Sequence, residues 1–334
     1  MSYRRVRRSC HRHPCWHGTL IGAALGMLAL LPEAFAGEGR DIEGGAAAPA
    51  NASLNVHPGM QAAQTAIDTE PVSEETRRFR TRLVLLGAPA GVALYGASSW
   101  WGSEVSDFHV VHEGWFGQET YAGGADKLGH GFSAYLGMRL ATWALEWAGN
   151  SHVDAMRTGS LLSLGTFMAI EMFDGFSEDY GFSVEDAVIS VAGIGMGYAL
   201  ERYPALDEVL DFRIRYRRSD DAKRLGEYDP VSDYSGQTFF MVAKAAGFPK
   251  LRSSPWTRYL ELAVGYGTRG YEPNDGSPND PRRLLFVGIS LNLSEILNDT
   301  VFRKHRGSTG QELANGVLEF FQVPGTGVYA DHRL

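Results

Sequence analysis

Three apolar stretches constrain the fold of this chain more than any other feature of its sequence. They span residues 126–148, 153–173 and 184–203. In the first, Leu128, Phe132, Leu136 and Leu140 follow one another at helical spacing. The other two are rich in small residues, and Gly193 and Gly197 form a G-x-x-x-G pair that allows helix backbones to approach closely. The connections between the stretches are short, so we expect consecutive helices to run antiparallel in a bundle.

Polar residues occur at the places that such a bundle brings to one end. These places are the start of the first helix, the end of the second and the start of the third. They carry Asp126, Lys127, His130, Glu171, Asp174, Ser183 and Asp186. Asp126 and His130 lie one helical turn apart, as do Glu171 and Asp174. Helix axes about 8–10 Å apart would let these side chains meet, so the sequence predicts a polar cluster at the end of an apolar scaffold.

Each polar residue also has an interpretation that needs no function. Asp126 can cap its helix and complement the helix dipole, Ser183 and Asp186 fit a capping box, and His130 can be a hydrogen-bonded core histidine. Asp174 can belong to a turn before Gly175. Glu171 is harder to explain in this way, because burying a lone carboxylate within FMAIEMF is costly. His130 is its expected partner.

Three kinds of chemistry are compatible with such a cluster. A divalent ion such as zinc, manganese or iron would take its ligands from Asp126, His130, Glu171, Asp174 and Asp186, although the chain has no H-E-x-x-H spacing. His130 and Glu171 are also candidates for a catalytic acid–base pair. A serine hydrolase is less favoured, because Ser133 and Ser183 lack the G-x-S-x-G context. Beyond a possible divalent metal, no cofactor is indicated.

The N-terminal segment predicts export. Five arginines precede a short apolar run that ends at Ala34-Phe35-Ala36, which is typical of a signal peptide over residues 1–36; a retained N-terminal anchor is the alternative. Cleavage would remove both cysteines, Cys10 and Cys15. It would leave 26 basic and 38 acidic residues, so the formal net charge would change from −8 to about −12. An acidic surface of this kind argues against binding to nucleic acid.

The remaining segments complete a mainly α prediction: an antiparallel bundle of about four apolar helices with a small β-hairpin appendage. Residues 37–75 lack periodicity and are predicted to be a disordered leader. Residues 83–101 contain no charge and end in two tryptophans, so they are either a short membrane span or a buried helix bent at Pro89. The bundle is assigned to residues 76–212 and a C-terminal region to 213–334.

Within the C-terminal region, four smaller elements are expected. A charged, solvated boundary is followed by a short helix around residues 232–248, a strand pair with alternating apolar residues, and an amphipathic helix containing QELANGVLEFFQVP. The two strands are placed at Leu260, Leu262, Val264 and Tyr266, and at Leu285, Val287, Ile289 and Leu291.

Two segments resemble a known family. GWFGQETYAGGADKLGHGFSAY and EMFDGFSEDYGFSVEDAVISVAGIGMGYALE are similar to the DUF2279 family of YfiM-like predicted periplasmic proteins and, more distantly, to VanZ-like membrane proteins. The family's D-K-x-x-H start, central acid and late D-x-x-x-x-x-x-G element correspond to Asp126, Lys127, His130, Glu171, Asp186 and Gly193. Many members are thought to be lipoproteins, whereas neither cysteine here lies in an L-x-x-C context. The resemblance implies a compartment and a site, and no particular reaction.

Taken together, these patterns predict an exported, membrane-associated protein of the periplasm or outer membrane of a Gram-negative-type envelope. Its polar cluster would either be structural or bind a membrane lipid headgroup or an envelope protein. The alternative hypothesis is a metal-dependent or acid–base hydrolase that acts on an envelope lipid or glycan, with His130 and Glu171 as the catalytic candidates.

Overall fold

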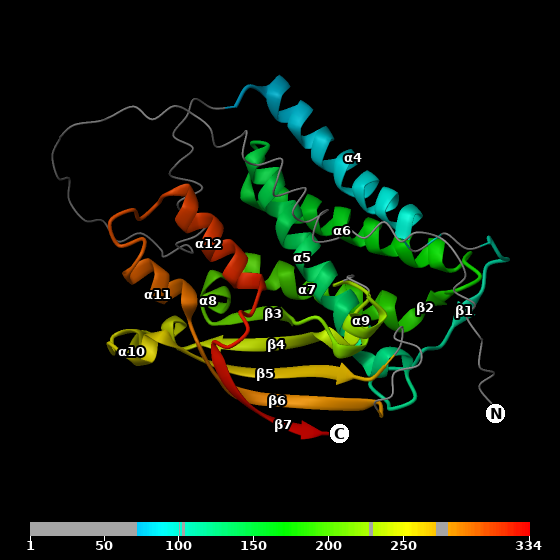
Figure 1. Ribbon diagram of the computed structural model, residues 1–334. Coiled ribbons are helices and arrows are strands. Elements are labelled where there is room, and N and C mark those ends of the chain that lie inside the picture. The colour runs from blue at the N-terminus through cyan, green and yellow to red at the C-terminus, as the bar shows by residue number, and fades with distance from the viewer. Residues whose placement is uncertain (1–71, 100, 102–103, 227–229, 272–279) are drawn as a thin grey trace.

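The computed structural model describes residues 72–99, 101, 104–226, 230–271 and 280–334. Helices lie above a sheet in the view of Figure 1, with α12 to the left of α5 and above β3. The longer helices are α4 (Glu74–Ser99), α5 (Ala125–Trp147), α6 (His152–Asp174), α7 (Val184–Arg202) and α12 (Thr309–Phe320). The shorter ones are α8 (Pro204–Asp207), α9 (Asp220–Leu225), α10 (Pro249–Arg252) and α11 (Leu293–Asp299). The predicted signal peptide, both cysteines and most of the predicted leader lie outside the described residues.

Helix α5 is the central helix and packs against both α6 and α7. The three predicted apolar helices are therefore confirmed within a residue or two of their expected bounds. Ser151 begins α6 as its N-cap, because its hydroxyl accepts a hydrogen bond from the backbone N–H of Asp154. The close helix approach expected from the G-x-x-x-G pair occurs between α5 and α7, where Gly193 lies against the backbone of Gly131.

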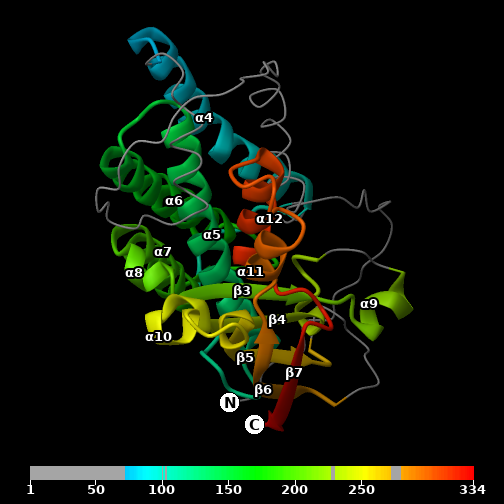
Figure 2. The ribbon, with the colours of Figure 1, turned by 90° about the vertical axis from the view of Figure 1, so that its left-hand side faces the viewer.

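Five antiparallel strands form one sheet in the order β3-β4-β5-β6-β7. They are β3 (Leu210–Tyr216), β4 (Gln237–Lys244), β5 (Leu260–Arg269), β6 (Arg282–Leu291) and β7 (Gly327–Arg333). Two short parallel strands, β1 (Val110–Val111) and β2 (Phe182–Ser183), pair separately beside the start of α7. The sheet lies below the long helices in both ribbon views (Figures 1 and 2).

The prediction of a helical bundle with a small hairpin is wrong, because the hairpin strands belong to this larger sheet. β5 and β6 pair as expected, with Leu262 opposite Ile289. The charges from Arg213 onward were predicted to form a solvated boundary, but Arg213 is buried in β3 and pairs with Asp211 and Glu261. The segment of β4 was predicted to be a short helix, but it is a strand with Phe239 and Phe240 buried on its two faces.

An aromatic cluster joins the helices to the sheet. Phe132 and Tyr135 of α5 contact Phe212 of β3, while Phe239 of β4 and Phe320 of α12 close the cluster. Each ring pair is tilted or edge-on, with ring centroids 5.4–6.0 Å apart. This cluster fixes α5, and with it the polar residues at its start, relative to β3 and β4.

A buried arginine makes a second connection between the elements. The Arg139 guanidinium lies 2.7 Å from Glu201 of α7, 2.7 Å from Asp207 of α8 and 2.5 Å from Glu319 of α12. Burial alone would lower the pKa of Arg139, but these carboxylates raise it well above its usual range. The charge that interrupts the apolar pattern of α5 is therefore an ion-pair centre that joins three other helices.

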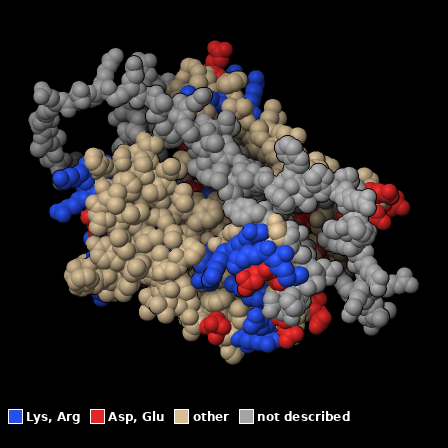
Figure 3. Space-filling model, viewed as in Figure 1, with Lys and Arg blue, Asp and Glu red and all other residues tan. Residues whose placement is uncertain are grey.

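The surface carries its charges unevenly. Figure 3 shows Lys and Arg side chains gathered near α9 and again near the loop between α11 and α12, with few charged side chains between them. Within the described residues, no helix combines the length and the hydropathy that a membrane crossing requires, and this holds for α4 as well.

Candidate functional site

A glycine turn sets the start of α5. Ala122, Gly123 and Gly124 all have positive φ angles, of 47°, 62° and 87°. A Cβ atom at Gly124 would lie 2.6 Å from the carbonyl oxygen of Trp115, so the turn has no space for a side chain there. The hydroxyl of Tyr266 in β5 donates a hydrogen bond to the carbonyl of Gly123. The two glycines before Asp126 therefore hold the start of α5 against the sheet.

Lys127 forms the fully buried half of the polar cluster. Its ammonium group donates to Asp126 at 2.9 Å, lies 2.9 Å from Asp186 of α7 and also bonds Glu113 in the segment before α5. The side chain has no solvent exposure. Burial alone would lower the pKa of Lys127, but the three carboxylates outweigh it and raise the pKa. This half of the cluster is satisfied internally and joins α5 to α7.

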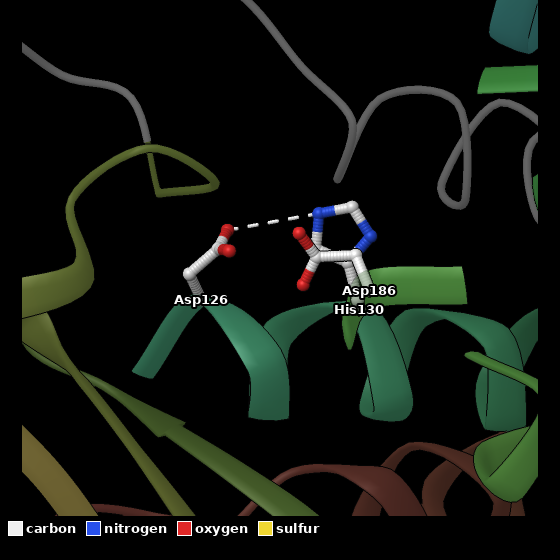
Figure 4. Close-up of side chains that lie close together, drawn as sticks. All are labelled: Asp126, His130 and Asp186. Carbon is white, nitrogen blue, oxygen red and sulfur yellow. Dashed lines mark ion pairs between the residues drawn. The ribbon is translucent and has the colours of Figure 1, made fainter. Parts of the chain in front are cut away.

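His130 forms the second half. Its Nδ1 lies 3.3 Å from Glu171 of α6, and its Nε2 lies 3.6 Å from Asp126, the contact drawn in Figure 4. Glu171 also accepts a hydrogen bond of 3.3 Å from the backbone N–H of Ser183. Asp126 accepts a further bond of 2.6 Å from the hydroxyl of Tyr234. The imidazole is thus held between carboxylates from two helices.

The charges of the cluster shift the pKa values of its members in different directions. Burial would lower the pKa of His130, but Asp126, Asp186 and Glu171 raise it to about 10. Burial would raise the pKa of Asp126, but His130 and Lys127 hold it below its ordinary value. Burial and the neighbouring Asp126 raise the pKa of Glu113 to about 8. At neutral pH the cluster therefore holds an imidazolium, an ammonium and at least one protonated carboxyl group.

Two of the predicted cluster residues have a different role. Asp174 makes its hydrogen bond of 2.6 Å with the indole N–H of Trp101, and burial raises its pKa to about 6. The hydroxyl of Ser183 accepts from the backbone N–H of Asp186 at 3.2 Å, so Ser183 caps α7. Asp126 is not the cap of α5, because Gly124 occupies that position.

Sequence reasoning missed two residues of the site. Glu113 lies in an aromatic-rich connector without periodicity, and Tyr234 follows Asp126 by 108 residues in a short turn before β4. No local pattern marks Tyr234. Its placement depends on the sheet, which was not predicted. Glu113 stands in the motif HEGW, whose charge had no visible partner in the sequence.

A cavity of about 1000 Å³ adjoins the His130 half of the cluster. Asp126, His130 and Glu171 line its polar end. Its walls are largely apolar and come from α5, α6 and α12; they include Leu136, Leu140, Trp143, Phe167, Leu313 and Val317. This size is at the upper end of the range of about 300–1000 Å³ that small-molecule sites occupy.

Comparison with known proteins places the cluster within one family. Residues 112–202 match the family described as "Predicted periplasmic lipoprotein (DUF2279)". These residues, about a quarter of the chain, form the segment that matches DUF2279. Neither a curated protein nor a solved structure matches the chain. The resemblance to DUF2279 is confirmed over this range, and the VanZ-like likeness gains no support. The family description supports an exported, periplasmic protein.

The DUF2279 segment contains a group of residues with the ligand types for a divalent ion. Asp126, His130 and Asp186 each offer one atom within 4.8 Å of the others (Figure 4). Lys127 already supplies a cation to Asp126 and Asp186. A metal-ligating histidine must also be neutral, whereas the raised pKa of His130 favours the imidazolium. The donor set therefore fits a divalent ion poorly, and the chain's own two cations balance these acids.

The raised pKa values give the DUF2279 segment a defined pH dependence. Folded His130 keeps its proton up to a pKa of about 10, whereas the free side chain loses it near 6.5. Between these values the folded state binds more protons, so stability falls as the pH rises. Glu113 acts in the same direction between 4.5 and about 8. We expect the melting temperature to decrease steadily between pH 6.5 and about 10.

Thermal unfolding of wild type and His130→Gln across this pH range tests the assignment. The melting temperature of the variant should decrease clearly less over this pH range, because the histidine with the strongly raised pKa is gone. His305→Gln removes an exposed histidine and should keep the wild-type slope. Equal slopes in all three proteins would mean that His130 does not hold its proton through the carboxylates.

Proposed function

We propose that this periplasmic protein binds an amphipathic, lipid-like molecule, with the alkyl chain in the cavity and a cationic headgroup at the His130 half of the cluster. The observation that carries this proposal is the junction of a polar cluster with a largely apolar cavity of about 1000 Å³. A purely structural cluster would be saturated on all sides, as the Lys127 half is. The His130 half instead lines an open space.

The apolar walls favour an alkyl chain. Leu136, Leu140 and Trp143 lie along one side of α5, and Phe167 of α6 and Val317 of α12 line the same cavity. Burial of apolar surface contributes about 25 cal/mol per Å² of surface removed from water. A chain lying along α5 would be stabilised by this contribution without any specific polar contact, so specificity would have to come from the polar end.

The charges at the polar end favour a cationic headgroup. Four carboxyl groups, from Glu113, Asp126, Glu171 and Asp186, face two cations, from Lys127 and His130, and the raised pKa of Glu113 keeps that carboxyl group protonated at neutral pH. The remaining excess of one negative charge would attract an ammonium group rather than a phosphate or carboxylate. Among envelope lipids, phosphatidylethanolamine ends in such an ammonium group, and its phosphate would lie outside the cluster.

The hydrolase hypothesis has less support. A general base needs a pKa near the working pH, and the pKa of His130 is about 10. Its imidazolium could only donate a proton at neutral pH. Glu171 would have to act as the base while it accepts from the backbone N–H of Ser183 and neighbours the imidazolium. These contacts favour a fixed carboxylate that orients a headgroup.

Native mass spectrometry with lysophosphatidylethanolamine and lysophosphatidylglycerol of the same chain length would test the proposal. We expect the ethanolamine lipid to bind and the anionic lipid to bind at least about tenfold more weakly. Glu171→Gln should weaken binding of the ethanolamine lipid by about 10–100-fold, because a charge-assisted hydrogen bond contributes about 1.5–3 kcal/mol.

The matched control is Glu178→Gln, which changes an exposed carboxylate in the loop after α6 and should leave both affinities unchanged. Failure of both lipids to bind would contradict occupation of the cavity. Equal binding of both lipids, or an unaltered affinity in Glu171→Gln, would contradict recognition of the headgroup by the cluster.

A further inference from the structure

One face of the sheet is aliphatic and open to solvent along β5 and β6. Leu262 and Ile289 face each other across these strands and are 54% and 57% exposed. Residues of the same face on four strands extend the surface, and all of them are exposed. These are Met241, Leu260, Val264, Val287, Leu291 and Val328. Together with Leu262 and Ile289 they form what we call the aliphatic face.

The opposite face of the same strands is buried and combines apolar and charged residues. Phe240, Val242, Ala263 and Phe286 form an apolar cluster on it. Arg213 of β3 donates to Asp211 and Glu261, at 2.8 Å for the closest oxygen of Glu261, and all three residues are buried. Ser290 of β6 donates to Glu261 at 3.1 Å. This face therefore buries charged groups beside an apolar cluster, whereas the aliphatic face leaves its side chains open to solvent. An outward-facing apolar surface of this extent is typical of a surface with a partner.

Aromatic and basic residues flank one end of the aliphatic face. Helix α10 and the turn after it lie beside the end of the sheet where β5 begins (Figures 1 and 2). There Phe248, Leu251 and Trp256 are exposed, Trp256 by 78%. Lys250 and Arg252 alternate with them and are exposed as well. Tryptophan and basic side chains next to an aliphatic surface are the combination found at membrane–water interfaces.

We propose that the aliphatic face docks on the surface of a phospholipid bilayer, with α10 at the level of the headgroups. The composition favours lipid over a second protein. Protein interfaces are enriched in aromatic residues and arginine at their centre, whereas here the centre is purely Leu, Ile, Val and Met and the aromatic residues lie at its edge. Lys250 and Arg252 complement the anionic headgroups of phosphatidylglycerol.

This docking is independent of the ligand cavity. Leu262 and Ile289 are outside the cavity lining, and the cavity residues of α5 and α6 are outside the aliphatic face. Substitutions on the sheet therefore leave headgroup recognition intact. The two proposals can fail separately.

Flotation of the exported protein with vesicles of phosphatidylethanolamine and phosphatidylglycerol would test the docking. We expect wild type to float with the vesicles. Leu262→Glu/Ile289→Glu places two charges at the centre of the aliphatic face and should reduce the bound fraction at least tenfold. Both positions are exposed, so circular dichroism and melting temperature should match those of wild type.

The matched control is Leu161→Glu/Val191→Glu, which changes two exposed apolar residues on α6 and α7 and should keep vesicle binding. Equal loss in both double variants would overturn the proposal, as would failure of wild type to float. Sedimentation in the absence of vesicles tests whether the aliphatic face binds a second copy of the chain instead. A dimer that Leu262→Glu/Ile289→Glu converts to monomer would assign the face to a second copy and overturn docking on lipid.

Discussion

Replacing Lys127 with methionine is expected to lower the free energy of unfolding by about 3–5 kcal/mol, because removal of one partner leaves buried charges uncompensated. Three carboxyl groups, from Glu113, Asp126 and Asp186, surround the ammonium group. Lys127 is fully buried, and methionine fills most of its volume, so the loss reports the charge rather than a cavity. The expected effect is a large fraction of a typical domain stability of about 5–15 kcal/mol.

Urea unfolding followed by circular dichroism measures this effect, and Lys223→Met provides the control. Lys223 of α9 is half exposed and pairs with an exposed Asp220 at 2.8 Å. Such surface pairs contribute about 0–1 kcal/mol, so the control variant should be close to wild type. Adding Asp186→Asn to Lys127→Met should restore part of the loss. Equal stability of Lys127→Met and wild type would show that the Lys127 half does not hold α5 to α7.

The helices and the grouping of polar residues were predictable because both depend on local pattern. Apolar spacing located α5, α6 and α7, and their short connections brought Glu171 and Asp186 to the level of His130. Asp174 lies one turn beyond Glu171 and accepts a hydrogen bond from the indole N–H of Trp101, a contact that no local pattern indicates. Helical spacing gives the face of a residue, but it does not give the partner that the rest of the chain brings there.

The sheet was not predictable from the same patterns, because its strands bury charged side chains next to apolar ones. Sequence reasoning expects a charge to face water, so the charges from Arg213 onward indicated a solvated segment. In the fold Arg213 is buried and pairs with Asp211 and with Glu261, 48 residues further along the chain. The period-two alternation of β5 and β6 was recognised, but it does not indicate that Leu262 and Ile289 stay exposed. Periodicity gives the two faces of a strand and does not say which one is covered.

Tyr234 and Glu113, which complete the site, could not be predicted from local patterns either. Tyr234 reaches Asp126 because β4 pairs with β5 and α5 packs on both strands. Glu113 reaches Lys127 because the chain before α5 folds back through the turn of Gly123 and Gly124. Both contacts depend on tertiary packing across the boundary between helices and sheet. That boundary is where the sequence contains the least periodic signal.

The second large effect on stability is expected at Gly193, where α7 lies closest to α5. Gly193→Ala is expected to lower the free energy of unfolding by about 3 kcal/mol, at the upper end for overpacked sites. A Cβ atom at this position would overlap the carbonyl oxygen of Gly131 and lie 2.9 Å from its carbonyl carbon. Backbone atoms cannot rotate away as a flexible side chain can, so the two helices would have to separate. Separation would also move Asp186 away from Lys127, because Asp186 lies two turns before Gly193 on α7.

Gly195→Ala provides a control within the same helix. A Cβ atom at Gly195 meets nothing within 4 Å, so alanine should stabilise the protein by about 0.5–1 kcal/mol through its higher helix propensity. The two variants add the same methyl group two residues apart and should change the unfolding midpoint in opposite directions. Stabilisation by both substitutions would mean that α7 does not approach α5 at Gly193. The meeting of Lys127 with Asp186 would then lose its structural basis, because that contact needs the two helices to be this close.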